Sequence, residues 1–495
     1  GLADKRTYVG HVYYGKRIRP QDMRYLLRVG EPPYVPSENN RERCSFYDTF
    51  PFEYSGNGVG DYRESAIAVT TVEGQHAILP TYVSYGITKE KPLLAGLPSS
   101  FDRDKNTETL IIHCTDSALN VNVDLYYTVF EDTDMITRSV HICNQDEKPI
   151  YLTKALSACL DMDDNDYEML TLHGSWARER QMDRRAIGYG KTSVGSIKGE
   201  SSHQEHPFMA WMTKNATQTT GEVYAMHFIY SGNFIAQLEK SQFDSIRAVM
   251  GIHPADFGWK LEIGDAFDTP EVVLTYSADG LGTMTRNFHD FYRNHLIRSK
   301  YRNQKRPVLI NNWEATYFDF NTEKLLDIAR TAAKHGIEML VMDDGWFGKR
   351  NDDNSSLGDW QVNEQKLGGS LAQLIERVHE QGVKFGIWIE PEMVNEDSDL
   401  YRAHPDWAIQ IPGRNPMRSR YQLLLDLSNP DVQDYLYERI SAILNSADIS
   451  YVKWDMNRSI SDWYTALLPA NRQGELPHRY VLGVYALLER LTSAF

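Results

Sequence analysis

Up to about residue 300, apolar and polar positions alternate along the chain with a period of two. In residues 119–129, every second residue from Leu119 is apolar or aromatic. Such alternation is typical of a strand with one face buried and one face in water. Similar segments, separated by clusters of Gly, Asn, Asp and Pro, occupy residues 136–143, 223–230, 246–252 and 272–276. The pattern predicts an N-terminal antiparallel β-sandwich over residues 1–300.

Near Pro307 the pattern changes to short apolar strands that alternate with amphipathic helices. Strands are expected at residues 308–310, 337–342, 383–389 and 423–426, with a further one running into Tyr451. Helices are expected to begin at the capping residues Asn321, Ser370 and Asn429, and another over residues 475–491. Repeated strand-helix units form parallel sheets. The spacing, without a Gly-rich phosphate turn, favours a (β/α)8 TIM barrel over residues 301–495.

This predicted barrel is incomplete in the chain. Residues 308–495 have room for only about five strands, whereas a closed barrel needs eight strands and about 250 residues. At the other end, residues 7–14 resemble one strand of a hairpin whose partner would lie upstream. We therefore expect the chain to be truncated at both ends, without the remaining barrel and a C-terminal β-domain.

The composition of the chain indicates which classes of ligand it can bind and in which cellular compartment it is found. The formal net charge is −16, from 52 Lys and Arg against 68 Asp and Glu, and such a surface repels nucleic acid and anionic membranes. No long apolar run or signal peptide is visible, so no membrane association is expected. The four cysteines lie far apart, which favours free thiols and a cytoplasmic location. An aromatic content of 12% suits a sugar site, since flat rings stack on pyranose C–H faces.

Two polar segments of the first part are predicted to be surface loops. Residues 41–63 contain Asn-Gly and Gly-Asp turns together with several charges. Residues 173–180 place Trp176 beside alternating charges. By pattern alone, such segments are more often solvated loops than sites.

Acidic and tryptophan side chains gather where the predicted strands of the second part end. Active sites of barrels lie at that end of the strands, so the clustering favours an active site over structural ion pairs. Adjacent acids such as Asp343 and Asp344 need hydrogen-bond donors, and sugar hydroxyls are suitable. Trp313, Trp346 and Trp388 are predicted to wall the pocket. The whole set is Trp313, Asp343, Asp344, Trp388, Glu390, Asp426, Lys453, Asp455 and Asn457.

The stretch from Lys453 to Asn457 carries the candidate chemistry. On an extended chain Lys453, Asp455 and Asn457 point to the same side. The lysine would lower the pKa of Asp455, which suits a carboxylate that attacks as an anion. A structural salt bridge at the strand end is the alternative. A divalent-cation site is another alternative, with the hard oxygen ligands Asp343, Asp344, Glu390, Glu392 and Asp455. The tryptophans favour carbohydrate, and we expect no metal and no cofactor.

Four motifs of the second part resemble those of a known family. They are residues 312–315 (NWEA), 343–348 (DDGWFG), 388–393 (WIEPEM) and 453–458 (KWDMNR). Together they are similar to the motifs of bacterial family 36 glycoside hydrolases, which are α-galactosidases. The resemblance covers nearly the whole chain and includes the segment around Trp176.

The resemblance implies a retaining α-galactosidase that hydrolyses galacto-oligosaccharides of the melibiose and raffinose type. Asp455 would be the nucleophile that forms a galactosyl-enzyme. Asp343 and Asp344 would hold the 4-hydroxyl and 6-hydroxyl groups of galactose. The other substrate-binding residues would be Trp313, Trp388, Arg420, Lys453 and Asn457.

The resemblance also implies features outside this strand-end cluster. The Trp176 segment would close over the site, and Arg43 matches a position that reaches a neighbouring subunit's pocket in tetrameric members, so a homotetramer is expected. The acid/base aspartate of the family follows a Gly-rich motif and is expected just beyond Phe495.

Alternative functions are an α-N-acetylgalactosaminidase, an α-galactosyl transferase of the same family, or an inactive carbohydrate-binding fragment.

Overall fold

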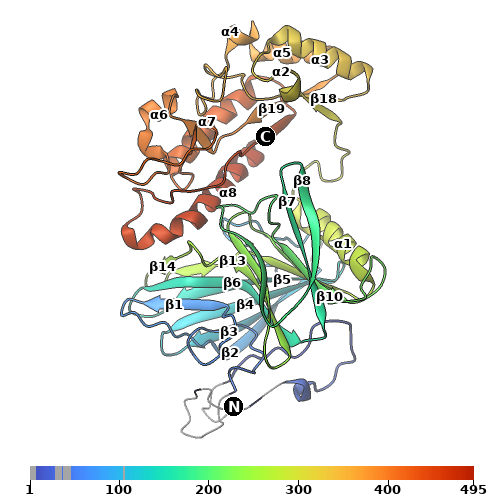
Figure 1. Ribbon diagram of the computed structural model, residues 1–495, viewed down its shortest axis with the longest axis vertical. Helices are drawn as coiled ribbons and strands as arrows, with labels where there is room; N and C mark the ends of the chain where they lie inside the picture. Colours follow the sequence, from blue (N-terminus) through green and yellow to red (C-terminus); the bar gives the residue numbers. More distant parts are fainter. Residues whose placement is uncertain (1–6, 28–29, 31–35, 37–45, 104–105) are drawn as a thin grey trace. The chain divides into compact units, whose positions relative to one another are not determined.

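The computed structural model describes residues 7–27, 30, 36, 46–103 and 106–495 (Figure 1). The chain divides into two compact units, Gly1–Arg298 and Ser299–Phe495. Arg43 and Cys44 lie outside the described residues. The other three cysteines, Cys114, Cys143 and Cys159, are free, as the sequence predicted.

The first unit consists mainly of antiparallel strands (Figure 1). Those in its first half are β1 (Ile67–Thr71), β2 (Thr81–Thr88), β3 (Thr107–Asp116), β4 (Val121–Phe130), β5 (Met135–Asn144), β6 (Ile150–Asp163), β7 (Tyr167–Ser175), β8 (Arg178–Ala186) and β9 (Gly190–Ser196). They are followed by β10 (Phe208–Thr213), β11 (Val223–Phe228), β12 (Phe234–Lys240), β13 (Ser245–Ile252), β14 (Trp259–Leu261), β15 (Ala266–Asp268), β16 (Val272–Ser277) and the helix α1 (Gly280–Phe291).

Apart from β9, these strands form two sheets. The larger has the order β2-β3-β4-β5-β16-β11-β10-β7-β8, with β15 beside β5, and the smaller has the order β1-β6-β13-β12, with β14 beside β6. The indole N–H of Trp211, on β10, donates to the sulfur of Met162, on β6, at 3.1 Å, so the two sheets are in contact. A second apolar layer forms where α1 packs Leu281, Met284 and Phe288 against the larger sheet.

The strands predicted from alternation are confirmed, but two other expectations for this unit are wrong. Residues 7–14 form no strand; their main chain bonds to residues 51–53 instead, and Tyr8 packs among Phe46, Tyr47, Phe50 and Phe52. Residues 173–180 lie at the surface as expected, at the tip of the β7–β8 hairpin. Within the segment 41–63, Asp61 and Arg63 are buried instead of lying at the surface.

Asp61 and Arg63 belong to a buried network of four charged side chains. Arg63 donates to Asp61 at 2.9 Å and to Asp161 at 3.1 Å. Arg247 donates to Asp161 through two nitrogens, at 2.6 and 2.7 Å, and to Asp61 at 2.9 Å. Two arginines thus neutralise two aspartates between β6, β13 and the segment before β1, which satisfies charges that would otherwise be costly to bury.

His227, on β11, is half-buried and packs against Phe288 of α1 and against Tyr292, which follows this helix. Its ring stacks on His206 at 5.5 Å, and the hydroxyl of Tyr292 lies 2.5 Å from its Nδ1. Burial, followed by the charges of His206 and Arg180, lowers the pKa of His227 to about 3. The imidazole is therefore neutral in the folded protein at any moderately acidic pH.

Acidification is expected to destabilise the first unit through His227. The unfolded chain has a histidine pKa of about 6.5, above the folded value, so the unfolded state binds the proton first and stability falls as the pH drops below about 6.5. Between pH 7.5 and pH 5 the loss should be about 1–2 kcal/mol. Urea unfolding at both pH values measures it. His227→Gln should lose less on acidification, while His289→Gln, at an exposed position of α1, should behave like the parent.

The second unit has a mixed composition of strands and helices. Its strands are β17 (Leu309–Asn311), β18 (Met339–Met342), β19 (Lys384–Ile389), β20 (Met393–Asn395), β21 (Gln422–Leu424) and β22 (Tyr451–Trp454). Its helices are α2 (Trp313–Thr316), α3 (Thr322–Lys334), α4 (Glu364–Leu367), α5 (Leu371–His379), α6 (Asp399–Ala403), α7 (Pro430–Ser446) and α8 (Leu476–Ala494).

A parallel sheet with the order β17-β18-β19-β22 forms the centre of the second unit. Helix starts are those predicted: Asn321 caps α3, Asn429 caps α7, and Ser370 with Gln373 makes a capping box on α5. The strand expected at residues 423–426 is the exception. It pairs antiparallel with β20, outside the parallel sheet, because the chain doubles back after β19 and Leu425 bonds to Glu392. The parallel sheet therefore has four strands and not the five counted from sequence.

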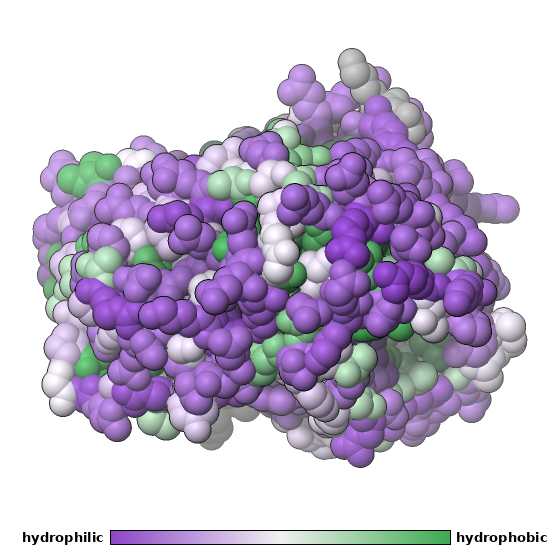
Figure 2. Space-filling model, turned by 90° about the horizontal axis from the view of Figure 1, so that it is seen from above, coloured by the Kyte–Doolittle hydropathy of each residue, from purple (hydrophilic) through white to green (hydrophobic). Residues whose placement is uncertain are grey.

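The molecular face seen in Figure 2 is largely hydrophilic, with apolar side chains scattered among polar ones. Across the residues that the structure describes, none of the helices is both long and apolar enough to cross a bilayer.

Candidate active site

Polar side chains from all four strands of the parallel sheet meet at its C-terminal edge. Because neighbouring parallel strands end at the same edge, residues far apart in sequence come together there. Asn311 ends β17, Asp343 follows β18, Glu390 follows β19, and Asp455 follows β22. This is the edge at which the sequence predicted a site.

Asp455 is held by three N–H donors. The indole N–H of Trp388 donates to its Oδ2 at 3.0 Å, and the side-chain amide of Asn457 donates to the same oxygen at 2.8 Å. The main-chain N–H of Met456 donates to Oδ1 at 3.1 Å. All three donors are neutral, so they orient the carboxyl group without an ion pair.

Lys453 makes an ion pair with Asp343 and not with Asp455. Its Nζ lies 2.9 Å from Oδ2 of Asp343, which also accepts from the side chain of Asn311. The expectation that Lys453 directly supports the charge of Asp455 is therefore wrong. Side chains at alternate positions point the same way only while the strand continues, and β22 ends at Trp454.

The carboxylate oxygens of Asp344 accept hydrogen bonds from another side chain of the protein. Arg350, which is fully buried, donates to both of its oxygens, at 3.0 Å to Oδ1 and 2.9 Å to Oδ2. The main-chain N–H of Asp344 also donates to Asp343 at 2.9 Å. Burial raises the pKa of Asp344, and the charge of Arg350 opposes the rise. The two adjacent acids thus have different cationic partners, since Lys453 pairs with Asp343 and Arg350 pairs with Asp344.

The three tryptophans expected to wall a pocket have different places. Trp388 is 2% exposed and reaches Asp455 with its indole N–H. Trp346 is completely buried and donates to the main-chain oxygen of Trp388 at 2.9 Å, so it supports the site from the core. Trp313 is half-buried, and its main-chain N–H donates to Asn311 at 2.8 Å.

Arg420 is linked to Arg350, the partner of Asp344, through an ion pair that both make with Asp353. Its guanidinium donates to Asp353 at 2.9 Å, and Asp353 lies 3.7 Å from the guanidinium of Arg350. Arg420 and Tyr421 both adopt the left-handed backbone conformation, with φ of 49° and 60°. For residues with a Cβ this conformation costs free energy, so the turn that presents Arg420 is strained.

Two predicted substrate-binding residues are not part of this cluster. Trp176 lies in the first unit, at the tip of the β7–β8 hairpin, where 84% of its surface is exposed. Arg43 falls outside the described residues.

Glu390 is a residue that the sequence placed in the strand-end cluster without assigning it a role. It is fully buried, accepts from the main-chain N–H of Asn457 at 2.9 Å, and accepts from the side chain of Gln422 at the same distance. Burial, followed by the charge of Asp455, raises its pKa to about 7. Its position directly after β19 was visible in the sequence, but its burial was not.

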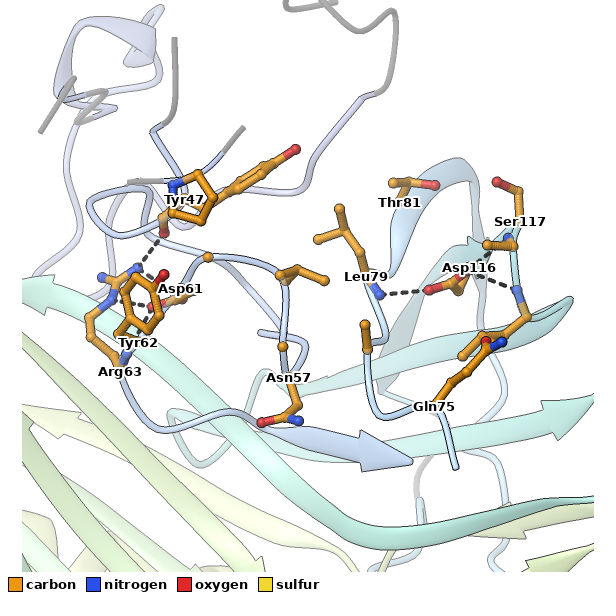
Figure 3. Close-up of a pocket in the computed structure, with 17 residues that line it drawn as sticks. Tyr47, Asn57, Asp61, Tyr62, Arg63, Gln75, Leu79, Thr81, Asp116 and Ser117 are labelled. Carbon is orange, nitrogen blue, oxygen red and sulfur yellow. Dashed lines mark hydrogen bonds and ion pairs between the residues drawn. The ribbon is translucent and has the colours of Figure 1, made fainter. Parts of the chain in front are cut away.

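A cavity of about 720 Å³ in the first unit offers no comparable chemistry (Figure 3). Its acidic residues are already used: Asp61 binds Arg63 and Arg247, and Asp116 accepts from the main chain of Leu79 and Leu119. No group of three or more His, Cys, Asp or Glu side chains suited to a metal occurs among the described residues.

Comparison with known proteins assigns the chain to a family. Residues 7–262 match the glycosyl hydrolase family 36 N-terminal domain, and residues 266–495 match Melibiase. The chain belongs to glycosyl hydrolase family 36.

Relatives of this family 36 chain include several α-galactosidases. It is 48% identical over 494 residues to the bifunctional α-galactosidase/sucrose kinase AgaSK of Mediterraneibacter gnavus, covering 99% of this chain and 52% of that protein. It is 45% identical over 490 residues to the α-galactosidase AgaA of Geobacillus stearothermophilus, covering 99% of this chain and 67% of that protein. The chain thus spans between about half and two thirds of the length of these relatives.

Solved structures give the same family. A crystal structure of a variant of AgaA in complex with raffinose matches with a TM-score of 0.97 at 44% identity, covering 99% of this chain and 68% of that one. The galactosidase domain of AgaSK matches with a TM-score of 0.94 at 48% identity, covering 99% and 67%. The fold of the family 36 chain is therefore that of known glycoside hydrolases.

Proposed function

We propose that this chain is the part of a retaining α-galactosidase that carries the nucleophile, and that the nucleophile is Asp455. The observation that supports this most directly is the set of three neutral N–H donors that hold the Asp455 carboxylate at the C-terminal edge of the parallel sheet. A carboxylate oriented in this way is positioned to attack a carbon atom.

The reaction proceeds in two displacements. The Asp455 carboxylate attacks the anomeric carbon of an α-galactoside, the glycosidic bond breaks, and a carboxylic acid protonates the leaving oxygen. Water then hydrolyses the galactosyl-enzyme, and the net α configuration is retained. The chain spans about two thirds of the length of AgaA, so activity is to be measured on the protein in its native length.

Asp343, Asp344 and Lys453 are proposed to bind galactose hydroxyls. The Lys453–Asp343 pair offers both a donor and an acceptor to a hydroxyl group, and Arg350 holds the Asp344 carboxyl in place beside it. Trp388, Trp313, Arg420 and Asn457 are proposed to complete the sugar site, with Trp176 closing it.

Oligosaccharides of the raffinose type are the proposed substrates. AgaA variants of Geobacillus stearothermophilus were crystallised in complex with raffinose and with stachyose, and these structures match the chain at 44% identity. A β-sandwich followed by part of a TIM barrel is the proposed architecture, supported by the two antiparallel sheets and the parallel sheet. A homotetramer is proposed from the family resemblance, and a cytoplasmic location is supported by the free thiols.

Covalent labelling tests the proposed nucleophile. A 5-fluoro-α-galactosyl fluoride should inactivate the enzyme and add one fluorogalactosyl group to the peptide that contains Asp455. The ring fluorine slows both displacements, but the anomeric fluoride leaves readily in the first one, so the covalent intermediate accumulates. Mass spectrometry of the digested protein locates the label. Attachment to another carboxylate would refute the assignment, and a preference for α-N-acetylgalactosaminides over α-galactosides in a substrate panel would refute the proposed specificity.

A further inference from the structure

Glu390 connects two segments beneath the Asp455 carboxylate. It follows β19 directly and is completely buried. Its Oε1 accepts from the main-chain N–H of Asn457, and its Oε2 lies 2.9 Å from Nε2 of Gln422, the first residue of β21. Glu390 therefore connects the turn after β22 to β21, which pairs with β20 outside the parallel sheet.

The hydrogen bond between Glu390 and the main chain of Asn457 affects Asp455 through the side chain of Asn457. The main chain of Asn457 is fixed by Glu390, and its side-chain amide donates to Asp455 at 2.8 Å. Loss of the Glu390 contact would free the Asn457 main chain and leave a buried N–H without an acceptor. The amide would then no longer be held against Asp455.

The surroundings of Glu390 favour a neutral carboxyl group. Burial is the largest influence that raises the pKa of Glu390, and the charges of Asp455 and Asp344 raise it further, whereas the hydrogen bond from Asn457 and the charge of Arg420 lower it. Its direct partners Asn457 and Gln422 are uncharged. A second observation points the same way, since Oε1 of Gln422 is buried and has no hydrogen-bond partner among the described residues. If the Gln422 amide is turned by half a rotation, that oxygen faces Glu390 and accepts its proton.

We propose that Glu390 is a positioning residue for the nucleophile, which works as a neutral carboxylic acid that donates to Gln422, accepts from Asn457 and so holds the Asn457 amide on Asp455. This inference rests on the proposed function, in which Asp455 attacks. With Glu390 neutral, Asp455 carries the charge of this pair alone. Ionised Glu390 would place a second buried anion beside it.

The proposal predicts a dependence on pH with a definite sign. Burial raises the pKa of Glu390 to about 7, so the group is neutral below that pH and ionises above it. The alkaline limb of kcat/KM should therefore contain the ionisation of Glu390. Replacement by glutamine, which is neutral and can make both contacts at every pH, should move that limb to higher pH.

Three variants test the role of Glu390 in the protein of native length. Glu390→Gln should keep a kcat/KM close to that of the parent at pH 6, and Glu390→Ala should lose about 10²-fold, mainly in kcat, because the Asn457 amide is misplaced. Glu392→Gln is the matched control: that buried carboxyl bonds to Trp454 and Tyr480 instead, so its substitution should leave the pH profile unchanged.

Infrared difference spectra supply a readout that does not depend on turnover. At pH 6 the parent minus Glu390→Gln spectrum should contain the carbonyl band of a protonated carboxyl group, and the band should be lost as the pH rises through about 7. If the band is missing, or if Glu390→Gln is as impaired as Glu390→Ala at every pH, Glu390 acts as an anion and the proposal is wrong. Covalent labelling of Asp455 would succeed in that case, so failure of this inference is distinguishable from failure of the proposed function.

Discussion

Asp455→Gly is expected to reduce kcat/KM for an aryl α-galactoside by at least about 10⁴-fold in the protein of native length. The variant keeps the sheet edge and its sugar contacts but removes the carboxylate to which Trp388 and Asn457 donate. The nearby acids have other partners, because Asp343 is paired with Lys453, Asp344 with Arg350, and Glu390 with Asn457 and Gln422. Initial rates on parent and variant measure the loss, and an unchanged unfolding midpoint would show that the fold is intact.

Azide should restore turnover to Asp455→Gly. The small anion fits the space left by the carboxylate and attacks the anomeric carbon in its place, forming β-galactosyl azide and releasing the phenol. Asp343→Ala is the matched control: it should also lose activity, since a substrate contact and the partner of Lys453 are removed, but azide should not restore it. Rescue of both variants, or of neither, would contradict the assignment of the nucleophile.

Arg247→Met is expected to destabilise the first unit by about 3–5 kcal/mol. The substitution keeps an apolar stem of similar length but leaves Asp61 and Asp161 with Arg63 as their remaining cation in the network. All of these side chains are at most 5% exposed, so solvent cannot compensate the lost charge. Urea unfolding followed by tryptophan fluorescence gives the change in free energy.

Arg293→Met is the control for Arg247→Met. Arg293 makes an ion pair with Asp290 at 2.7 Å, but both side chains are more than half exposed, and such pairs contribute little. A destabilisation of similar size in the two variants would mean that the loss comes from side-chain packing rather than from the buried charges. In that case, adding Asp161→Asn to Arg247→Met should not restore the free energy of unfolding either.

Local signals in the sequence predicted the elements of the fold well. The buried face of α5, made by Leu371, Leu374, Ile375 and Val378, and its capping box were both read directly from spacing. These features depend on residues within one or two turns of each other, so neighbours in sequence determine them. The same holds for β4, whose alternation is present in the chain before any tertiary contact forms.

Pairings between distant segments could not be predicted in this way. The partner of Lys453 is 110 residues away, and the tie between Glu390 and Asn457 spans 67 residues. The strand after Gln422 had the right composition for the parallel sheet, yet it pairs with β20. The burial of Asp61 and Arg63 likewise depends on Arg247, in a strand far along the chain. Composition places charges in a region but does not tell which charge faces which.

The order of strands in the parallel sheet has a consequence for biosynthesis. β22 pairs with β19, yet roughly 60 residues separate them in the chain, and a ribosome that adds about 5–20 residues per second needs about 3–12 seconds to make that stretch. During this time the apolar edge of β19 has no partner on one side, and unpaired edges of this kind promote aggregation. Slower growth at low temperature, or a chaperone that covers the edge, should therefore raise the yield of folded protein more than any change made to the first unit.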